Sequence, residues 1–458
     1  MKKNTMLWLL SFIVCTSLSI NAAIPYSGDA SSPATYTVMM QAKEKKATVQ
    51  HTDIANQLKK TLEQDKQLKH LVERSIRKAA VINPDRQTNP AQSLDEFYDF
   101  IDYSLTRMPW NILPDSRYSS FATKCDQSIL YAYFLLDQPL PELQNQGLFY
   151  NSVEYLQPIY TWLTDYNNAW KVYLDSPQSW KDEYYQMLEQ DPTWNLDKGW
   201  YESKANWHSF NDFFARKLSS PAMRPVAALN DESIVAAPAD SLPQGVWQIN
   251  ANTGKFMADP IKNEEGLLIK SSFYCSIEQM LGEKGQQFAP SFYGGVLTHS
   301  YLNYDDYHRY HAPVSGTIVA KYIVPYANAV GGVVYWDANK QLYVLESNSL
   351  SWQAYETRGC IIIDTGHGLV AMLPIGMGQV SSVNFTKNVQ VGKHIQKGDE
   401  VGYFLFGGSD CVMIFSPETK FQLTAKAGGT GSYSNGYAHL LCGAEYGIIQ
   451  GVRKHGQH

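Results

Sequence analysis

The sequence is poor in cysteine and has none of the closely spaced cysteine pairs that hold zinc. It contains six cysteines in 458 residues, and no two of them form a C-x-x-C motif. Cys15 falls in a predicted targeting segment, so an odd number of cysteines is left for the folded chain. This count argues against a disulfide framework and a structural zinc site, although one or two bridges stay open in an oxidising compartment.

The sequence also lacks a strong net charge and, beyond its first residues, a long apolar run. Its net charge is −6, so no broad basic surface indicates nucleic-acid binding. After residue 23, no stretch approaches the roughly 20 apolar residues of a transmembrane helix. Hydrophobic residues make up 44% of the sequence and aromatic residues 13%, so the chain can form a large hydrophobic core. The length allows two or three domains at about 150 residues each.

The first 23 residues have the form of a secretory signal peptide. Lys2 and Lys3 precede an apolar stretch over residues 6–20, and small residues at 21–23 offer a cleavage site. We therefore exclude residues 1–23 from the fold and expect export to the periplasm or the medium. Whether the segment is cleaved or retained as an anchor is left open.

The rest of the chain divides into a helical part and a β-rich part. Residues 24–50 are polar, and apolar residues then recur at helical spacing over 51–80 and 93–105. Helical patterns continue over 127–136 and 152–174, with an interruption or kink expected near Pro158. After Trp207 the pattern changes to short apolar runs between Gly, Pro, Asn and Asp, which is typical of strands. We predict an α+β protein with a helical domain at 24–205 and a β-rich domain at 206–458.

The stretch Phe404–Phe415 contains two apolar runs separated by Gly407, Gly408 and Ser409. The apolar runs predict strands, and the glycine pair allows unusual backbone angles between them. The joint alone favours a hairpin turn or bulge. The alternative is a serine on a strained joint, whose hydroxyl can attack its own backbone.

Two histidines, His308 and His311, lie in a polar segment that begins with Asp305 and Asp306. A metal site is the least favoured interpretation, because no H-E-x-x-H pattern accompanies them. In a second interpretation, the histidines have only a structural role and form hydrogen bonds within a polar turn. In a third, they are general acid–base groups that titrate near neutral pH. Asp240 follows an apolar run and a proline, which indicates a turn or cap unless it orients one of the histidines.

In their order along the chain, four segments resemble the pyruvoyl-dependent phosphatidylserine decarboxylases. They are F-x-x-F-F-x-R-x-L with a later Arg-Pro at 210–225, P-A-D at 238–240, Y-H-R-x-H-x-P-V-x-G at 307–316, and K-G-D-E-x-G-x-F at 397–404, which leads to Gly408-Ser409. Each segment alone is weak, but four in order over about 200 residues are specific. The helical half resembles the extension of the tryptophan-decarboxylase branch, through Trp170, Leu174, residues 176–179 and Gly199-Trp200.

This resemblance implies that the chain cuts itself between Gly408 and Ser409. The family pattern makes Ser409 the nucleophile, His308 its base and Asp240 the group that orients His308, like a serine-protease triad. His311 is the candidate for later proton transfers or for contact with the substrate carboxylate. A covalent pyruvoyl group would replace Ser409 and decarboxylate an amine substrate through a Schiff base. The resemblance implies no metal.

The resemblance favours phosphatidylserine as the substrate, with phosphatidylethanolamine and CO₂ as products, because most of the family acts on this lipid. A free aromatic amino acid such as tryptophan is the alternative, which the N-terminal extension and the glycine pair favour. A non-enzymatic binding protein on a retired scaffold is the third alternative. Asp410 stands where the family usually has Ser or Thr, and Ser241 stands where Gly usually follows P-A-D. The expected partners are the phospholipid or amino-acid substrate, the protein's own cleaved small chain, a peripheral membrane contact and a second copy in a homodimer. No nucleic acid is expected.

Overall fold

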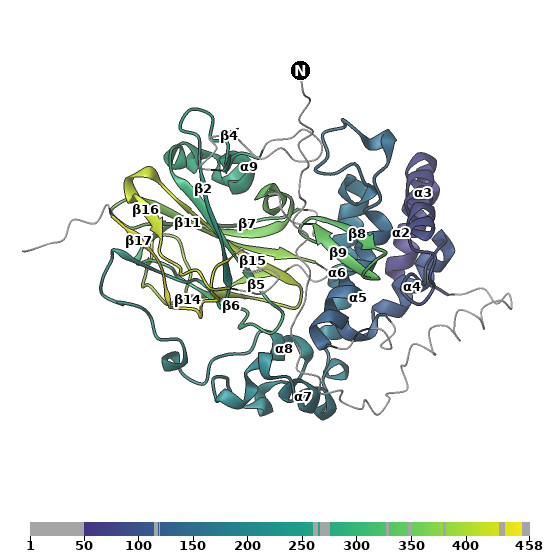
Figure 1. The fold of residues 1–458 in the computed structure, drawn as a ribbon, viewed down its shortest axis with the longest axis horizontal. Coiled ribbons are helices and arrows are strands. Elements are labelled where there is room, and N and C mark those ends of the chain that lie inside the picture. The colour runs from purple at the N-terminus through teal and green to yellow at the C-terminus, as the bar shows by residue number, and fades with distance from the viewer. Residues whose placement is uncertain are drawn as a thin grey trace, which may run out of the picture.

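The structure, a computed structural model, describes residues 50–113, 118, 120–259, 264–265, 275–326, 329–346, 350–378, 382–429 and 436–450. The predicted signal peptide at 1–23 lies outside these residues. Helices gather on one side of the molecule and sheets on the other (Figure 1). The α+β prediction is therefore confirmed, with most helices N-terminal and a β-rich C-terminal part.

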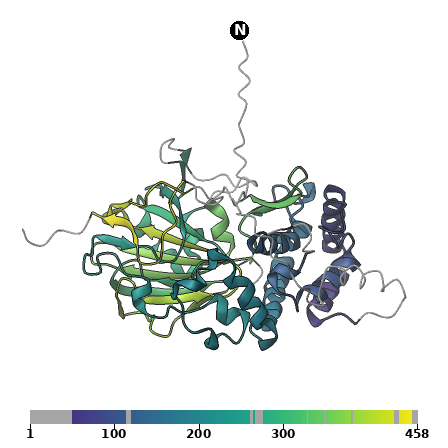
Figure 2. The ribbon, with the colours of Figure 1, turned by 60° about the horizontal axis from the view of Figure 1, so that its bottom comes forward.

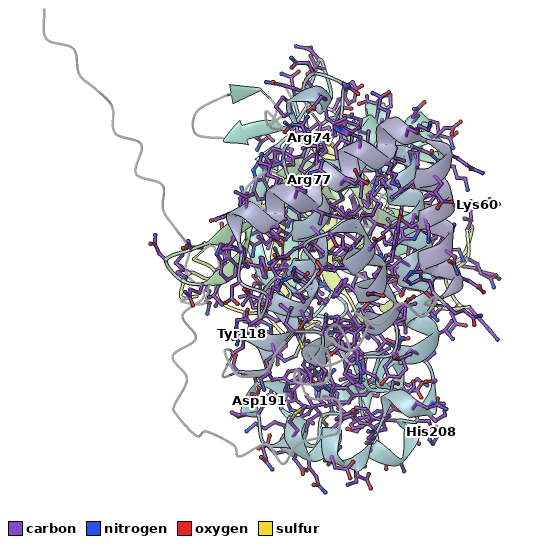
Figure 3. All side chains as sticks on the ribbon, turned by 90° about the vertical axis from the view of Figure 1, so that its right-hand side faces the viewer. Lys60, Arg74, Arg77, Tyr118, Asp191 and His208 are labelled. Atoms are coloured by element: carbon purple, nitrogen blue, oxygen red, sulfur yellow. The ribbon has the colours of Figure 1, made fainter. Side chains whose placement is uncertain are left out.

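The helical part runs from α2 to α8, with short 3₁₀ turns between several of its helices. Its α-helices are α2 (Asp53–Gln64), α3 (Lys66–Ile82), α4 (Leu94–Ser104), α5 (Phe121–Leu136), α6 (Gln157–Leu174), α7 (Asp182–Glu189) and α8 (Phe210–Phe214). Figure 2 shows these helices packed together beside the sheets. Figure 3 shows their outer face, where Arg74 and Arg77 lie along α3. None of the helices in the described ranges is long and apolar enough to cross a membrane.

Local sequence signals explain where these helices begin and end. The side chains of Thr52 and Asp65 accept backbone N–H groups at the starts of α2 and α3, so one predicted helical region is two helices. Ser93 caps α4, and Glu96 accepts the backbone N–H of Gln92 instead of that of Ser93, so the two residues do not form a capping box. The interruption or kink expected near Pro158 is an interruption, because a 3₁₀ turn over Val153–Tyr155 ends at Leu156 and α6 begins at Gln157 with Pro158 in its first turn.

The β-rich part is built around an antiparallel sheet of seven strands in the order β13-β7-β10-β11-β15-β5-β2. These strands are β13 (His394–Ile395), β7 (Gly316–Val324), β10 (Thr357–Asp364), β11 (Leu369–Met377), β15 (Gly408–Phe415), β5 (Val296–Leu302) and β2 (Leu242–Gln248). The strand β15 lies between β11 and β5, and its side chains are all buried. It is a central strand with a ladder of hydrogen bonds on both edges.

Smaller sheets complete this part. A three-stranded sheet contains β12 (Val383–Phe385), β14 (Glu400–Phe404) and β6 (Arg309–His311), and another contains β1 (Ile234–Ala236), β17 (Glu445–Ile449) and β16 (Phe421–Leu423). The hairpins are β3 (Met257–Asp259) with β4 (Glu264–Glu265), and β8 (Val333–Asp337) with β9 (Leu342–Glu346). A short helix, α9 (Ile277–Leu281), has a full capping box at Ser276 and Gln279.

The helical and β-rich parts share a hydrophobic core. Most of this core comes from the helices, but Val334 and Tyr343 of the β8–β9 hairpin and Phe406 belong to it as well. The hairpin lies against the helices in Figure 1. Gln127 of α5 clamps Tyr343 through two hydrogen bonds, one to its amide and one to its carbonyl. The boundary predicted near residue 205 is therefore crossed by continuous apolar packing.

Candidate active site

Ser409 is the second residue of β15 and lies inside the seven-stranded sheet. It is opposite Gly376 of β11 and Leu302 of β5, and it has no exposed surface. Its hydroxyl is buried and finds no hydrogen-bond partner among the described residues. A buried hydroxyl without a partner costs free energy, so such a group calls for a functional explanation.

The joint before Ser409 carries the chain from one sheet to another. The preceding strand, β14, pairs with β12 and β6, whereas β15 pairs with β11 and β5, so the joint is not a hairpin turn. Gly407 has φ 146°, a backbone angle that side chains rarely allow. At Gly408 a Cβ atom would come within 2.7 Å of Met377 Cγ, so the close approach of β11 requires glycine there.

His308 precedes β6 and has the tautomer that a general base needs. Its Nδ1 lies 2.9 Å from the carbonyl oxygen of Asp306. Because a carbonyl only accepts, Nδ1 carries the proton and Nε2 keeps a free lone pair. This Nε2 is buried and has no partner among the described residues. The ring of Phe214 stacks on the imidazole with 3.9 Å between centroids, which fixes its plane.

The surroundings of His308 keep its ring neutral. Complete burial lowers its pKa well below the usual value, and the nearby charge of Arg216 lowers the pKa further. Arg216 itself donates to the carbonyl oxygens of Asp305 and Asp306 at 2.7 and 2.9 Å. The same arginine therefore holds the loop that fixes the tautomer of His308 and disfavours its protonation.

Asp240 is held by Arg224 and does not contact His308 through any described hydrogen bond. The Nε of Arg224 donates to Oδ1 at 2.8 Å and Nη2 to Oδ2 at 2.5 Å, and the amide of Cys442 also donates to Oδ1 at 2.7 Å. Although burial opposes the charge of Arg224, Asp240 raises the pKa of the guanidinium. Arg224, the arginine of the Arg-Pro pair at 210–225, is thus the buried ion-pair partner of Asp240.

His311 is the histidine whose charge Asp240 favours. Burial lowers the pKa of His311, while its hydrogen bond to Gly398 and the charges of Glu400 and Asp240 act in the opposite direction. Its Nδ1 lies 2.8 Å from the carbonyl oxygen of Gly398, and its Nε2 lies 3.2 Å from the hydroxyl of Tyr307. In the described contacts Asp240 therefore acts on His311, while Ser409 Oγ and His308 Nε2 are each buried without a partner.

The segment after Tyr437 lies over Asp240 and the loop before His308, and no sequence pattern identified it. Besides the Cys442 amide on Asp240, Leu440 forms a β-bridge with Ser241. His439 Nε2 lies 2.8 Å from Asp306 Oδ1, in the loop before His308. No motif marks this segment, because its contacts are backbone bonds and one surface histidine. All of it lies C-terminal to Ser409.

A polar cavity of about 430 Å³ lies beside the joint. It is lined by Lys171, Asp175, Glu202, Asn206, Asn211, Asp212, Ala215, Lys217, Arg309, Tyr403 and Leu405. Asn211 links the cavity to the joint, since its side-chain oxygen accepts the amide of Phe406 at 3.1 Å. Charges of both signs on its wall suit a small zwitterionic molecule better than a hydrocarbon chain.

Comparisons with known proteins agree with this arrangement. The chain is 29% identical over 279 residues to decarboxylase iboD of Amanita muscaria, covering 55% of this chain and 75% of that protein. It is 30% identical over 248 residues to phosphatidylserine decarboxylase proenzyme 2 of Oryza sativa (54% of this chain, 35% of that protein). It is 28% identical over 229 residues to L-tryptophan decarboxylase of Psilocybe cyanescens (48% of each).

The chain spans about half or less of the length of the rice and Psilocybe relatives. All three relatives are named as decarboxylases, which are carboxy-lyases. Residues 210–436 match the phosphatidylserine decarboxylase family, and this range contains Asp240, His308, His311 and Ser409. Residues 210–436 therefore belong to the phosphatidylserine decarboxylase family.

Proposed function

We propose that this protein is a self-processing, pyruvoyl-dependent α-decarboxylase. The observation that carries the proposal is the pair of buried, unpartnered atoms Ser409 Oγ and His308 Nε2, one a nucleophile and the other a neutral base. Phe214 contacts both the His308 ring and Phe406, three residues before Ser409, and a general base that reaches the serine would activate its hydroxyl. The residues present fit a pyruvoyl group made from Ser409, since glycine precedes the serine and no described side chain competes for its hydroxyl.

In the first step, Ser409 Oγ attacks the carbonyl carbon of Gly408 while His308 Nε2 takes the hydroxyl proton. The C–N bond then breaks, which leaves Gly408 esterified to Ser409 Oγ and a free amino group on Ser409. Elimination of the Gly408 carboxylate and hydrolysis by one water, with loss of ammonia, leave a pyruvoyl group at position 409. When bound in this way, the group supplies a carbonyl that captures the substrate amine and accepts electrons as CO₂ leaves.

The fold keeps the two products of this cleavage together. The small chain, residues 409–458, contributes nearly all of β15, whose hydrogen bonds run to β11 and β5 of the large chain. Its β17 also pairs with β1. We expect the two chains to co-elute in native gel filtration and to separate only under denaturing conditions.

The substrate proposed for the first test is a free amino acid, with phosphatidylserine as the second candidate. The polar cavity beside Leu405 and the helices packed over the joint favour a small polar substrate. The large exposed apolar side chains in the described ranges are scattered: Val81, Ile82, Val172, Leu229, Tyr326 and Val391. They form no evident surface for acyl chains. The family name favours the lipid.

The test is denaturing electrophoresis with mass spectrometry of the purified protein and of Ser409→Ala. Wild type should give a fragment of residues 409–458 that begins with pyruvoyl, and Ser409→Ala should stay intact. CO₂ release is then measured in parallel on tryptophan, tyrosine and phosphatidylserine vesicles. An uncut wild-type chain would overturn the proposal and leave a binding protein on the same scaffold. Export and homodimer formation are further proposals, to be tested by fractionation and light scattering.

A further inference from the structure

Asp410 directly follows Ser409, but its side chain lies on the other face of β15. Neighbouring residues of a strand alternate between faces, so Ser409 shares one face with Cys411 and Asp410 shares the opposite face with Val412. Asp410 is opposite Tyr301 of β5 and has no exposed surface. Its carboxylate therefore does not lie beside the Ser409 hydroxyl, and it requires a partner within the core.

That partner is His299 of β5. Its Nδ1 lies 2.7 Å from Asp410 Oδ2, and the imidazole is 11% exposed. His299 is opposite Val412, so the pair runs diagonally across the ladder between the two strands. Trp247 packs over the imidazole with 5.2 Å between ring centroids, which restricts its orientation.

The carboxylate depends on this histidine for its charge-assisted hydrogen bond. Gln353 Nε2 lies 3.5 Å from the same oxygen, at the limit of a hydrogen bond. The other oxygen, Asp410 Oδ1, is buried without a partner among the described residues. His299 Nδ1 is thus the only short donor to Asp410 in the described contacts, and removing it would leave an uncompensated buried carboxylate.

The pair lies next to the chain end that cleavage would create. Cutting the chain between Gly408 and Ser409 turns the start of a central strand into a chain end, and chain ends fray unless they are tied down. Asp410 is one residue from the new end. A diagonal hydrogen bond to the neighbouring strand restrains this end without occupying the face on which residue 409 reacts.

We propose that Asp410 and His299 are positioning residues that hold the start of β15, and with it the group at position 409, in register after the chain is cut. The inference rests on the proposed function only in that the cut end exists if Ser409 is processed. The pair touches neither the Ser409 hydroxyl nor the His308 ring in the described contacts, so self-cleavage itself should not require it.

The test compares His299→Leu, which removes the donor, with His299→Gln, which retains an amide donor. Asp410→Ser removes the carboxylate together with its need for a donor. His394→Leu is the matched control, because His394 is exposed on β13 of the same sheet. Each variant is made in the wild-type chain and in the uncut Ser409→Ala chain.

The first measurement is hydrogen exchange at the backbone amides of residues 409–412. His299→Leu should speed exchange there by about 10-fold or more in the cut protein and by less in the uncut chain, because the uncut strand keeps its covalent tether. His299→Gln should restore most of the protection, and His394→Leu should match wild type.

The second measurement is steady-state decarboxylation. His299→Leu should lower kcat by about 10- to 100-fold while KM changes by less than about 3-fold, because misplacing a reacting group by about 1 Å has effects of this size. A lowered melting temperature with wild-type exchange at 409–412 and wild-type kcat would overturn the inference and leave the pair a structural one. If the wild-type chain is never cut, the proposed function fails. The positioning role would then be overturned as well if the amides of residues 409–412 exchange in uncut His299→Leu at the same rate as in the wild-type chain.

Discussion

The ring of Phe406 meets Trp170 of α6 edge-on, with 5.8 Å between ring centroids and 87° between ring planes. Phe406 stands two residues before Gly408, and both aromatic side chains are fully buried or nearly so. Phe210 and Phe214 of α8 pack against the same ring at 5.3 and 5.2 Å. The helical part therefore packs against the segment that joins β14 to the cleavage site.

Trp170→Ala should lower the free energy of unfolding by about 3–5 kcal/mol, because it leaves a large cavity in the shared core. It should also slow self-cleavage, since Phe406 loses its contact and the joint loosens. Denaturant unfolding of the Ser409→Ala form measures the first effect, and the time course of fragment appearance measures the second. Val172→Ala, on the exposed side of the same helix, is the control. Cleavage at the wild-type rate would show that the helical part does not support the joint.

His308→Gln should slow self-cleavage by about 10²- to 10⁴-fold, the usual contribution of a general base. Its Nε2 is the unpartnered base of the site, whereas the Nε2 of His311 is engaged by the Tyr307 hydroxyl. His311→Gln should therefore cleave faster than His308→Gln. Cleavage is followed by denaturing electrophoresis after rapid purification.

The opposite order would assign the base to His311, which is the histidine that the charge of Asp240 influences. Cleavage at wild-type rates in both variants would contradict base catalysis by either ring. Melting temperatures of both variants in the Ser409→Ala background separate loss of chemistry from loss of folding.

Arg224→Met should lower the free energy of unfolding by about 3–5 kcal/mol, because it leaves the Asp240 carboxylate buried without its charged partner. The double variant Arg224→Met with Asp240→Asn should recover part of this loss, since the unpaired charge is then gone. Urea unfolding of the three proteins in the uncut Ser409→Ala form measures the difference. Equal destabilisation of single and double variants would mean that packing of the arginine, and not the ion pair, accounts for the effect.

Much of the fold could be predicted from local pattern. Helical spacing gave α2 to α6, and the short apolar runs after Trp207 predicted the β-rich part. The sequence could not tell an interruption near Pro158 from a kink, because a proline in the first turn of a new helix looks the same in sequence as one that bends a continuous helix. The shared core could not be predicted, because Phe406 and Tyr343 lie more than 100 residues from the helices they contact.

The sequence named candidate members of the site but not their hydrogen-bond partners. The spacing of motifs brought Asp240, His308, His311 and Ser409 to attention, but it could not show that Asp240 pairs with Arg224. Long-range partners such as Asp410 and His299 follow from strand register, which single-strand patterns do not reveal. His439 was missed because a surface histidine in a loop carries no local signal.

The last prediction concerns pH and the contact between His439 and Asp306. Burial opposes the charged form of His439, but the hydrogen bond and charge of Asp306 outweigh burial and raise the pKa of His439, with Asp240 and Asp305 adding to the effect. A raised histidine pKa means that the stabilisation is complete below about pH 6.5, the ordinary histidine value, and is lost as pH rises through the folded-state pKa. Burial raises the pKa of Asp306 as well, so the pair also weakens when Asp306 takes up a proton in more acidic solution.

His439→Gln should therefore destabilise the protein most near pH 6 and very little at pH 9. The side chain of His439 is 34% exposed, so solvent screening keeps the effect below about 1 kcal/mol. Urea unfolding at both pH values in the Ser409→Ala form measures it, with His394→Gln as the control because its exposed ring is in none of the described ion pairs. A difference that is equal at pH 6 and pH 9 would show that the segment is held over the site by its backbone bonds to Ser241 and Asp240, and that the histidine pair adds nothing.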